Sequence, residues 1–356
     1  MVFLFIYHAS ALVRLILARA ARLRFSTYKL ILFLLFLFSA FRFEVGCDWT
    51  GYLAQYEVQR GAGWEAALLH REPLWWLVIE LTHRAGLLYP WLNVISSAVF
   101  FFGVHILARR QPDPLGFLIL LFPVLIINMP MSGIRQGAAV GLICIALTAF
   151  IDRRLIRFIF WVTIASGFHS SAAVFLLLAP LVWGSLTKGR VALSVLLAAP
   201  IAFLLLTSGD ADVAFSRYVD AGRDASGAVY RTGLLLLSGI FFLVVLRTKW
   251  RERFPLDHKL ASLGALMMIS TFPMVGLSTV IADRIGYYFV PIQAMIFSRV
   301  PYIHGGSLGR LLTAAPYIGL AVFFVTWTAT SRVFDQCYLP YRTWLFGIPE
   351  GTAYLF

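Results

Sequence analysis

Charged residues are scarce in this chain. Only 13% of its 356 residues are charged and 60% are hydrophobic, whereas an ordinary soluble domain carries about 25% charged residues. A soluble protein of this length cannot bury that much apolar surface, but a bilayer accommodates it. About 20 apolar residues suffice for one helix to cross the hydrocarbon core, and such stretches recur along the whole sequence. The composition therefore predicts an integral membrane protein.

Acidic residues are scarcer still, with 17 Asp and Glu against 30 Lys and Arg, which gives a formal charge of +13. Basic proteins often bind nucleic acid, but that function needs a basic stripe on a soluble fold. Here the positive residues stand in short loops between apolar runs, as cytoplasmic topology signals do. We therefore expect a lipid bilayer and no nucleic acid as partner.

Cysteine is also rare, and its three positions exclude a disulfide framework and a cysteine-rich metal site. Cys144 lies inside an apolar run, where it packs as a small core residue. Cys47 and Cys337 both fall on the external side of the predicted topology, so a disulfide between them and two separate thiols are both compatible with the sequence. The sequence also lacks a Walker A loop, a dinucleotide-binding glycine turn, a nucleophile elbow and any cluster with metal-ligand spacing. We accordingly expect no cofactor and no metal.

The apolar runs predict an all-α polytopic membrane protein with about 11 to 12 transmembrane helices, forming a single integral membrane domain over residues 1–356. The clear spanning candidates are 28–43, 89–108, 114–131, 134–151, 155–168, 170–186, 191–208, 232–248, 260–280, 285–300 and 311–331. Residues 2–18 are a weaker candidate because Arg14 interrupts them. The basic residues follow this apolar stretch instead of preceding it, so we expect a retained first helix or an interfacial one, not a signal peptide.

The orientation follows from the Lys and Arg bias. Placing the basic loops inside leaves four external segments, which are 44–88, 209–231, a short turn around Asp283, and the tail 332–356. Within the first of these, residues 73–88 look helical but are too polar for a comfortable span. We interpret them as an amphipathic or re-entrant helix at the outer interface. If this stretch spans the membrane, the topology is wrong.

The segment Asn128–Gln136 is the most informative motif near the outer boundary. Pro130 and Gly133 are expected to break one helix and leave Arg135 and Gln136 in the first turn of the next. A helix start with a guanidinium suits an anionic group such as a diphosphate. The alternative is an interfacial arginine that snorkels to lipid headgroups.

A histidine, His169, stands at a second predicted helix break near the same face, in Gly167-Phe-His-Ser-Ser-Ala172. Imidazole titrates near neutrality, so it can accept a proton or bind a phosphate oxygen. The plainer interpretation is a hydrogen-bonded packing residue.

Carboxylates and aromatic rings gather in the first external segment, at Asp48, Tyr52 and Glu72. A carboxylate can deprotonate a sugar hydroxyl, and an aromatic face can stack on a sugar ring. The alternatives are helix N-caps for the two carboxylates, with Pro73 at the first helical position, and an interfacial aromatic belt for the neighbouring tryptophans.

Further polar candidates lie nearer the carboxy terminus, and they are Arg217, Asp283, Arg284, Tyr287 and Tyr341. Ionisable residues at the ends of membrane spans are costly, which favours a functional interpretation. Asp283 and Arg284 are neighbours in the sequence, and the alternative is that their charges neutralise each other.

The order of these motifs resembles the EpsG family of exopolysaccharide proteins, which belongs with the Wzy-type polysaccharide polymerases. The resemblance covers about residues 28–300 and rests on Arg42, Gly46, Asp48, Tyr52, Tyr56, Glu72-Pro73, Ile134-Arg-Gln136, Ala138, Phe168-His-Ser-Ser-Ala172 and Asp283-Arg284, with an echo in Tyr338-Leu-Pro-Tyr341. Cys47 departs from the family pattern, which often has a small hydroxyl residue there, and the Arg-rich amino terminus is also unusual.

The resemblance implies a GT-C-like glycosyltransferase of the bacterial inner membrane, with its active site toward the periplasm or cell exterior. Such a polymerase transfers a glycan from polyprenyl diphosphate to a second lipid-linked repeat unit, and it works beside a chain-length regulator and a flippase. Arg135, Gln136 and Arg284 would then bind diphosphate, and His169, Asp48 or Glu72 would act as the base. Tyr52, Arg217, Asp283, Tyr287 and Tyr341 would contact the glycan.

Three other functions compete with this one. An O-antigen ligase shares the donor chemistry, and a non-enzymatic flippase for lipid-linked glycans would need charges through both leaflets. A membrane O-acyltransferase would need a histidine near the cytoplasmic face, and His169 is expected on the outer side.

Overall fold

The computed structural model describes residues 25–184, 187–194, 196 and 227–349. Within these residues the chain is helical, and its strand-like pairing is an isolated antiparallel bridge between Arg42 and Thr343. The expected all-α class is confirmed. The expected spans at 2–18 and, in large part, 191–208 lie outside the described residues, as does Arg217.

The chain divides into two compact units. Unit 1 comprises Met1–Leu142, Ile164–His169 and Ala315–Phe356, and unit 2 comprises Ile143–Thr163 and Ser170–Ala314. Each unit is described by itself below. The single membrane domain expected from the sequence stays a prediction.

Unit 1 contains the first helices of the chain and the last. Its elements are α2 (Phe25–Ala40), α3 (Trp49–Gln59), α4 (Gly63–Leu69), α5 (Pro73–Arg84), α6 (Pro90–Ala108), α7 (Pro114–Leu121), the π-helical turn η1 (Phe122–Ile126), the start of α8 (Ile134–Ile151), the end of α9 (Leu155–Phe168), the second half of α17 (Gly306–Thr330) and α18 (Arg332–Tyr338). The first external segment thus holds three helices, α3 to α5. At 12 residues, α5 is too short to span the membrane.

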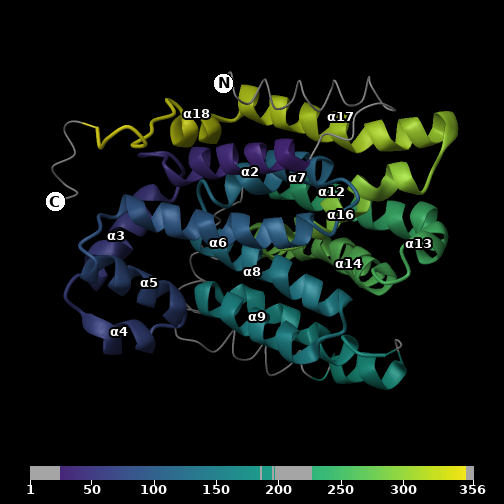
Figure 1. Ribbon diagram of the computed structural model, residues 1–356, viewed down its shortest axis with the longest axis horizontal. Coiled ribbons are helices and arrows are strands. Elements are labelled where there is room, and N and C mark those ends of the chain that lie inside the picture. Colours follow the sequence, from purple (N-terminus) through teal and green to yellow (C-terminus); the bar gives the residue numbers. More distant parts are fainter. Residues whose placement is uncertain (1–24, 185–186, 195, 197–226, 350–356) are drawn as a thin grey trace. The chain divides into compact units, whose positions relative to one another are not determined.

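Helices α2 and α6 lie side by side in unit 1 (Figure 1). The Tyr28 hydroxyl is 3.0 Å from Nδ1 of His105, and the rings of Phe36 and Phe101 meet edge to face at 6.3 Å. The first contact joins the start of α2 to the end of α6, and the second lies later in α2 and earlier in α6, so the two helices run antiparallel.

Glycine allows α6 and α8 to approach closely. A Cβ atom on Gly103 would lie 1.8 Å from the Gly141 carbonyl oxygen, and one on Gly141 would lie 2.6 Å from Cα of Phe100. Small residues permit such backbone contact between membrane helices, where dispersion and packing replace the hydrophobic effect. This close crossing holds α8 in place, and Arg135 stands at the start of α8.

Unit 2 holds the middle of the chain. Its elements are the 3-10 helix η2 (Ser170–Leu181), α12 (Ala228–Phe241), the π-helical turn η4 (Phe242–Leu246), α13 (Arg247–Arg253), α14 (His258–Thr271), η5 (Pro273–Gly276), α15 (Thr279–Tyr287), α16 (Val290–Arg299), η6 (Val300–Tyr302), and the parts of α8, α9 and α17 that unit 1 does not include. Helices α12 and α14 pack closely at Gly239, where a Cβ atom would lie 2.5 Å from the Ala265 carbonyl oxygen.

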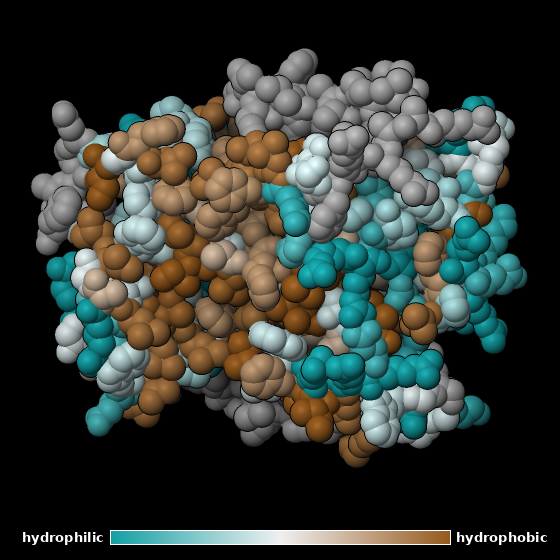
Figure 2. Space-filling model, viewed as in Figure 1, coloured by the Kyte–Doolittle hydropathy of each residue, from teal (hydrophilic) through white to brown (hydrophobic). Residues whose placement is uncertain are grey.

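Five helices among the described residues are long and apolar enough to cross a membrane, namely Pro90–Ala108, Ile134–Ile151, Ala228–Arg253, His258–Gly276 and Gly306–Thr330. Shorter apolar helices cover Ser26–Ala40, Pro114–Ile126, Leu155–Phe168 and Ser170–Leu181. Figure 2 shows apolar residues gathered where α2 and α6 run in Figure 1. Leu30, Phe33 and Phe102 of these helices are more than half exposed. A surface of this kind requires lipid and not water around it, so the multi-pass architecture is confirmed.

The expected boundary of one span was wrong. The sequence predicted a turn around Asp283 followed by a helix over 285–300, but Asp283 and Arg284 lie inside α15, and a separate helix α16 begins at Val290. The cause is Ser278, whose side-chain oxygen accepts a hydrogen bond from the Ile281 N–H and caps a helix that starts at Thr279. The chain then breaks at Tyr288 and Phe289.

Candidate active site

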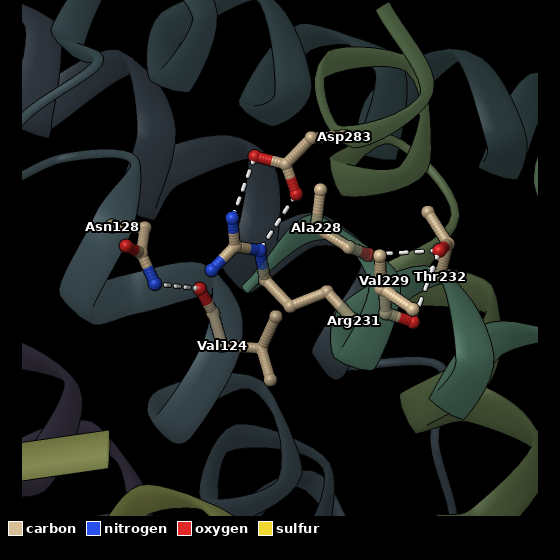
Figure 3. A network of polar contacts seen from close by, with 7 residues as sticks. All are labelled: Val124, Asn128, Ala228, Val229, Arg231, Thr232 and Asp283. Atoms are coloured by element: carbon tan, nitrogen blue, oxygen red, sulfur yellow. Dashed lines mark hydrogen bonds and ion pairs between the residues drawn. The ribbon is translucent and has the colours of Figure 1, made fainter. Parts of the chain in front are cut away.

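The loop before α8 places Arg135 in the first helical turn. Figure 3 shows the Asn128 amide donating to the Val124 carbonyl, at 2.8 Å. The Asn128 carbonyl in turn accepts the backbone N–H groups of Ser132 and Gly133. Helix α8 then begins at Ile134, so Arg135 is its second residue. The predicted break and helix start are confirmed.

The Arg135 guanidinium is held by a carboxylate of another helix. Its Nη1 lies 2.6 Å from a carboxylate oxygen of Glu72, and the two side chains are 24% and 9% exposed. Glu72 occupies the N-cap position of α5, with Pro73 next, yet its side chain makes no capping bond. The centre of the guanidinium also lies 6.0 Å from the ring centroid of Tyr52, within the range of a cation–π contact.

Asp48 points to the same loop. It occupies the N-cap position of α3 and, like Glu72, makes no side-chain capping bond. Instead, Oδ2 of Asp48 accepts a 3.4 Å hydrogen bond from the Ser132 hydroxyl, three residues before Arg135. The capping interpretation therefore identified the positions of both carboxylates and not their partners.

His169 follows the last residue of α9, as the predicted helix break required. Its backbone N–H donates to the Ala165 carbonyl at 2.9 Å, and the residue is 6% exposed. Two residues earlier, Gly167 lies against α5, because a Cβ atom there would be 2.6 Å from Cγ of Leu74. The end of α9 therefore packs beside the start of α5, near Glu72.

Unit 1 thus brings together Asp48, Tyr52, Glu72 and Arg135, with the His169 segment packed on α5. Gln136 follows Arg135 and is buried, with 5% exposure. Tyr341 lies elsewhere in the unit: its hydroxyl donates to the Phe38 carbonyl at 2.7 Å, and burial raises its pKa to about 12. Among the described residues there is no group of three or more His, Cys, Asp or Glu that could hold a metal ion.

Unit 2 contains a second charged cluster, on α12 and α15. Arg231 donates from Nε and Nη2 to the two carboxylate oxygens of Asp283, at 2.6 and 2.9 Å (Figure 3). Its guanidinium also lies 5.6 Å from the ring centroid of Tyr287. Asp283 is therefore paired across two helices, and not with its neighbour Arg284 as the self-neutralising alternative supposed.

Arg231 was not among the residues singled out from the sequence. A signal was available, because Arg231 stands at the edge of an apolar run, where an unpaired charge is costly. Nothing in the sequence identifies Asp283, 52 residues away, as its partner.

A disulfide joins Cys47 to Cys337 across 290 residues of sequence. The bridge left open by the sequence is therefore present, while Cys144 is free and buried in α8. The bridge connects the loop before α3 to the end of α18, two segments that the sequence predicts on the same side of the membrane.

Comparison with known proteins identifies the family. The family model described as "EpsG family" matches residues 2–343. A similar protein is the "EPS I polysaccharide export inner membrane protein EpsF" of Ralstonia nicotianae, 28% identical over 277 residues, which cover 71% of this chain and 63% of that protein. The chain thus spans less than two thirds of the length of this relative. No solved structure matches. Since the family match covers almost the whole sequence, this chain belongs to the EpsG family, whose members are membrane proteins related to exopolysaccharide.

Proposed function

We propose that the protein is a polysaccharide polymerase, a glycosyltransferase of the bacterial inner membrane that uses a polyprenyl-diphosphate-linked glycan as donor and a second lipid-linked repeat unit as acceptor. The relative from Ralstonia is named as an inner membrane protein of polysaccharide export, which agrees with this pathway class. The proposal rests on family membership together with the chemistry of the Arg135 cluster.

The reaction transfers the anomeric carbon of the donor glycan from a diphosphate oxygen to a hydroxyl oxygen of the acceptor glycan. A hydroxyl of the acceptor glycan attacks the anomeric carbon of the donor, and the bond from that carbon to the diphosphate oxygen breaks. The diphosphate leaves with the electron pair, and the hydroxyl proton passes to a base. The largest catalytic contribution in such a transfer comes from stabilising the charge that develops on the leaving group.

The single observation that carries the proposal is the position of Arg135. It stands at the start of α8, where backbone N–H groups and the helix dipole favour an anion. Its guanidinium is 24% exposed, so a lipid-linked diphosphate can reach it. Gln136 follows it on α8 and adds an amide donor.

Glu72 fits the role of a positioning residue better than that of the base. Its carboxylate already accepts a charge-assisted hydrogen bond from Arg135 at 2.6 Å, which holds the guanidinium in place. The base is then His169 or Asp48. Both belong to unit 1.

The disulfide supports an external active site. Such bridges persist in oxidising compartments and are rare in the cytosol. Cys47 precedes Asp48 directly, so the bridge supports the proposal that Asp48 and, through Ser132, the start of α8 face the periplasmic or outer side. In unit 2, Arg284 is proposed to bind diphosphate, and Asp283 and Tyr287 are proposed to contact the glycan.

The test uses the purified chain with lipid-linked repeat units, followed by gel analysis of the glycans. A ladder of products identifies a polymerase, capping of lipid A identifies a ligase, and transport without new bonds identifies a flippase. The variants are Arg135→Ala and His169→Ala. The matched control is Arg60→Ala, which removes an arginine whose pair with Glu57 is about half exposed, with side chains 50% and 42% accessible.

We expect ladder formation from wild type and from Arg60→Ala at equal rates. Arg135→Ala should lower the rate about 100-fold, the usual cost of removing one group that stabilises a developing negative charge. Full ladder formation by both Arg135→Ala and His169→Ala, at normal protein levels, would refute the assignment of these residues.

A further inference from the structure

The carboxy-terminal tail folds back onto the loop that precedes α3. The Phe43 N–H donates to the Arg342 carbonyl at 2.9 Å, and the Trp344 N–H donates to the Phe41 carbonyl at 3.0 Å. The Arg342 guanidinium lies 2.6 Å from the Glu44 carboxylate. We call the two paired segments, residues 41–48 and 337–344, the clasp.

The disulfide makes the clasp covalent. Cα of Cys47 lies 4.8 Å from Cα of Cys337, inside the usual range for bridged cysteines. Beside it, the Gly46 N–H donates to the Cys337 carbonyl at 2.6 Å. The loop is therefore attached to the tail through both a main-chain hydrogen bond and a covalent bond.

The clasp also touches the loop that begins α8. Gly46 has a left-handed φ of 103°, and a Cβ atom there would lie 1.9 Å from the Met131 carbonyl oxygen and 3.2 Å from Cα of Ser132. Two residues on, Asp48 accepts the hydrogen bond from Ser132. The clasp thus contacts the backbone three to four residues before Arg135.

We propose that the Cys47–Cys337 disulfide is a positioning device for the active site, which fixes Gly46 and Asp48 against Met131 and Ser132 and thereby sets where α8 begins and where Arg135 points. This inference rests on the proposed function for its consequence on activity, whereas its structural claim stands on the contacts alone. Cys47, Gly46 and Cys337 are positioning residues, since none of them touches the reacting groups.

The bridge forms by thiol–disulfide exchange with a disulfide oxidant of the external compartment. The two cysteine thiols lose two protons and two electrons to form the S–S bond, and the oxidant's disulfide is reduced to a dithiol. Dithiothreitol reverses the step: it becomes a cyclic disulfide, and the two thiols of the protein are regenerated. The active site is therefore completed after the chain reaches an oxidising environment.

The first experiment measures backbone hydrogen exchange in the full-length protein with and without dithiothreitol. Reduction should speed exchange in peptides covering 128–137, at the start of α8, because the loop there loses its support. Peptides covering 155–163 in α9 belong to the other compact unit and should keep their rates. Unchanged exchange over 128–137, with the bridge shown by mass spectrometry to be open, would overturn the inference whether or not the protein is a polymerase.

The second experiment measures polymerisation kinetics of Cys337→Ser and Gly46→Ala. The matched control for the cysteine is Cys144→Ser, a buried free thiol. The control for the glycine is Gly61→Ala, which has a similar left-handed φ of 76° but meets nothing within 4 Å. We expect kcat/KM to fall about 10- to 100-fold in both test variants, since misplacement of a catalytic group by about 1 Å has such effects, and to stay near wild type in the controls.

The outcomes separate the two proposals. An inactive wild type whose α8 peptides still respond to reduction would contradict the polymerase function and leave the positioning role supported. Equal kcat/KM in Cys337→Ser and wild type would contradict the positioning role. Losses of the same size in Gly46→Ala and Gly61→Ala would show that backbone strain, and not the contact with Met131, is responsible, and would also overturn it.

Discussion

Removing one partner of the Arg231–Asp283 pair should destabilise the protein severely. The pair forms two parallel hydrogen bonds of 2.6 and 2.9 Å, and its side chains are only 11% and 12% exposed. In Asp283→Ala the guanidinium stays buried among apolar helices without this carboxylate. The cost of breaking such a pair comes mainly from the charge left behind, and not from the contact that is lost.

The burial of the Arg231–Asp283 pair determines how much unfolding free energy is lost. Breaking a buried pair costs about 3 to 5 kcal/mol, whereas an exposed pair contributes about 0.2 to 1 kcal/mol. For a unit of roughly 150 to 250 residues, 3 kcal/mol corresponds to a fall in Tm of roughly 6 to 12 °C. The exposed Arg60–Glu57 pair provides the control, and Glu57→Ala should lower Tm by no more than about 4 °C on the same basis.

Thermal unfolding in detergent, followed by tryptophan fluorescence, measures these shifts. The double variant Arg231→Leu/Asp283→Leu should recover most of the loss, because no uncompensated charge remains in it. A double variant as unstable as Asp283→Ala would show that the fork geometry itself, and not burial of a lone charge, stabilises unit 2. A Tm for Asp283→Ala no lower than that for Glu57→Ala would refute the reasoning altogether.

Two further predictions concern unit 1. Gly103→Ala places a Cβ atom 1.8 Å from a carbonyl oxygen of α8 and should cost about 1 to 3 kcal/mol by overpacking, whereas Gly319→Ala, in open space on α17, should leave Tm unchanged; equal shifts would contradict the close crossing. Hydrogen bonds from Gln59 and Arg84 lower the pKa of Glu80, so its contribution to stability is present above the usual carboxyl range and is lost as pH falls through the lowered pKa. Wild type should therefore lose more Tm between pH 7 and pH 3 than Glu80→Gln, and parallel losses would contradict this.

Much of the fold was predictable, because the cost of exposing polar backbone to lipid leaves helices as the available spanning structure for apolar runs of this length. The predicted helix boundaries were wrong where a polar capping residue starts a helix inside or beside an apolar run. At Ser278 one hydroxyl starts a helix and moves Asp283 from a predicted turn into α15. In the segment 44–88 the sequence analysis predicted one helix, over 73–88, where the structure has three. Helices α3 and α4 were missed because they are short and their hydropathy is mixed.

The candidate site shows a sharper limit. The predicted helix starts placed Arg135 in a first turn and Asp48 and Glu72 at N-cap positions. The structure agrees on all three positions. The start of a helix is determined by nearby residues, whereas the partner of a side chain depends on which helices pack together. The sequence therefore left the N-cap role open for both carboxylates, although their side chains reach Ser132 and Arg135 instead.

The same physical cost explains both arginine–carboxylate pairs. A guanidinium cannot be deprotonated at physiological pH, so an arginine at the edge of an apolar helix needs an anion within reach, from the protein or from a substrate. Arg231, at 11% side-chain exposure, has its anion supplied bidentately by Asp283, whereas Arg135 is held through one oxygen of Glu72 and is 24% exposed. The Arg135 guanidinium is more accessible than the buried fork of Arg231 and Asp283, so an incoming diphosphate reaches it more easily. This difference in accessibility, and not the presence of an arginine as such, is why Arg135 is the better candidate for the substrate anion.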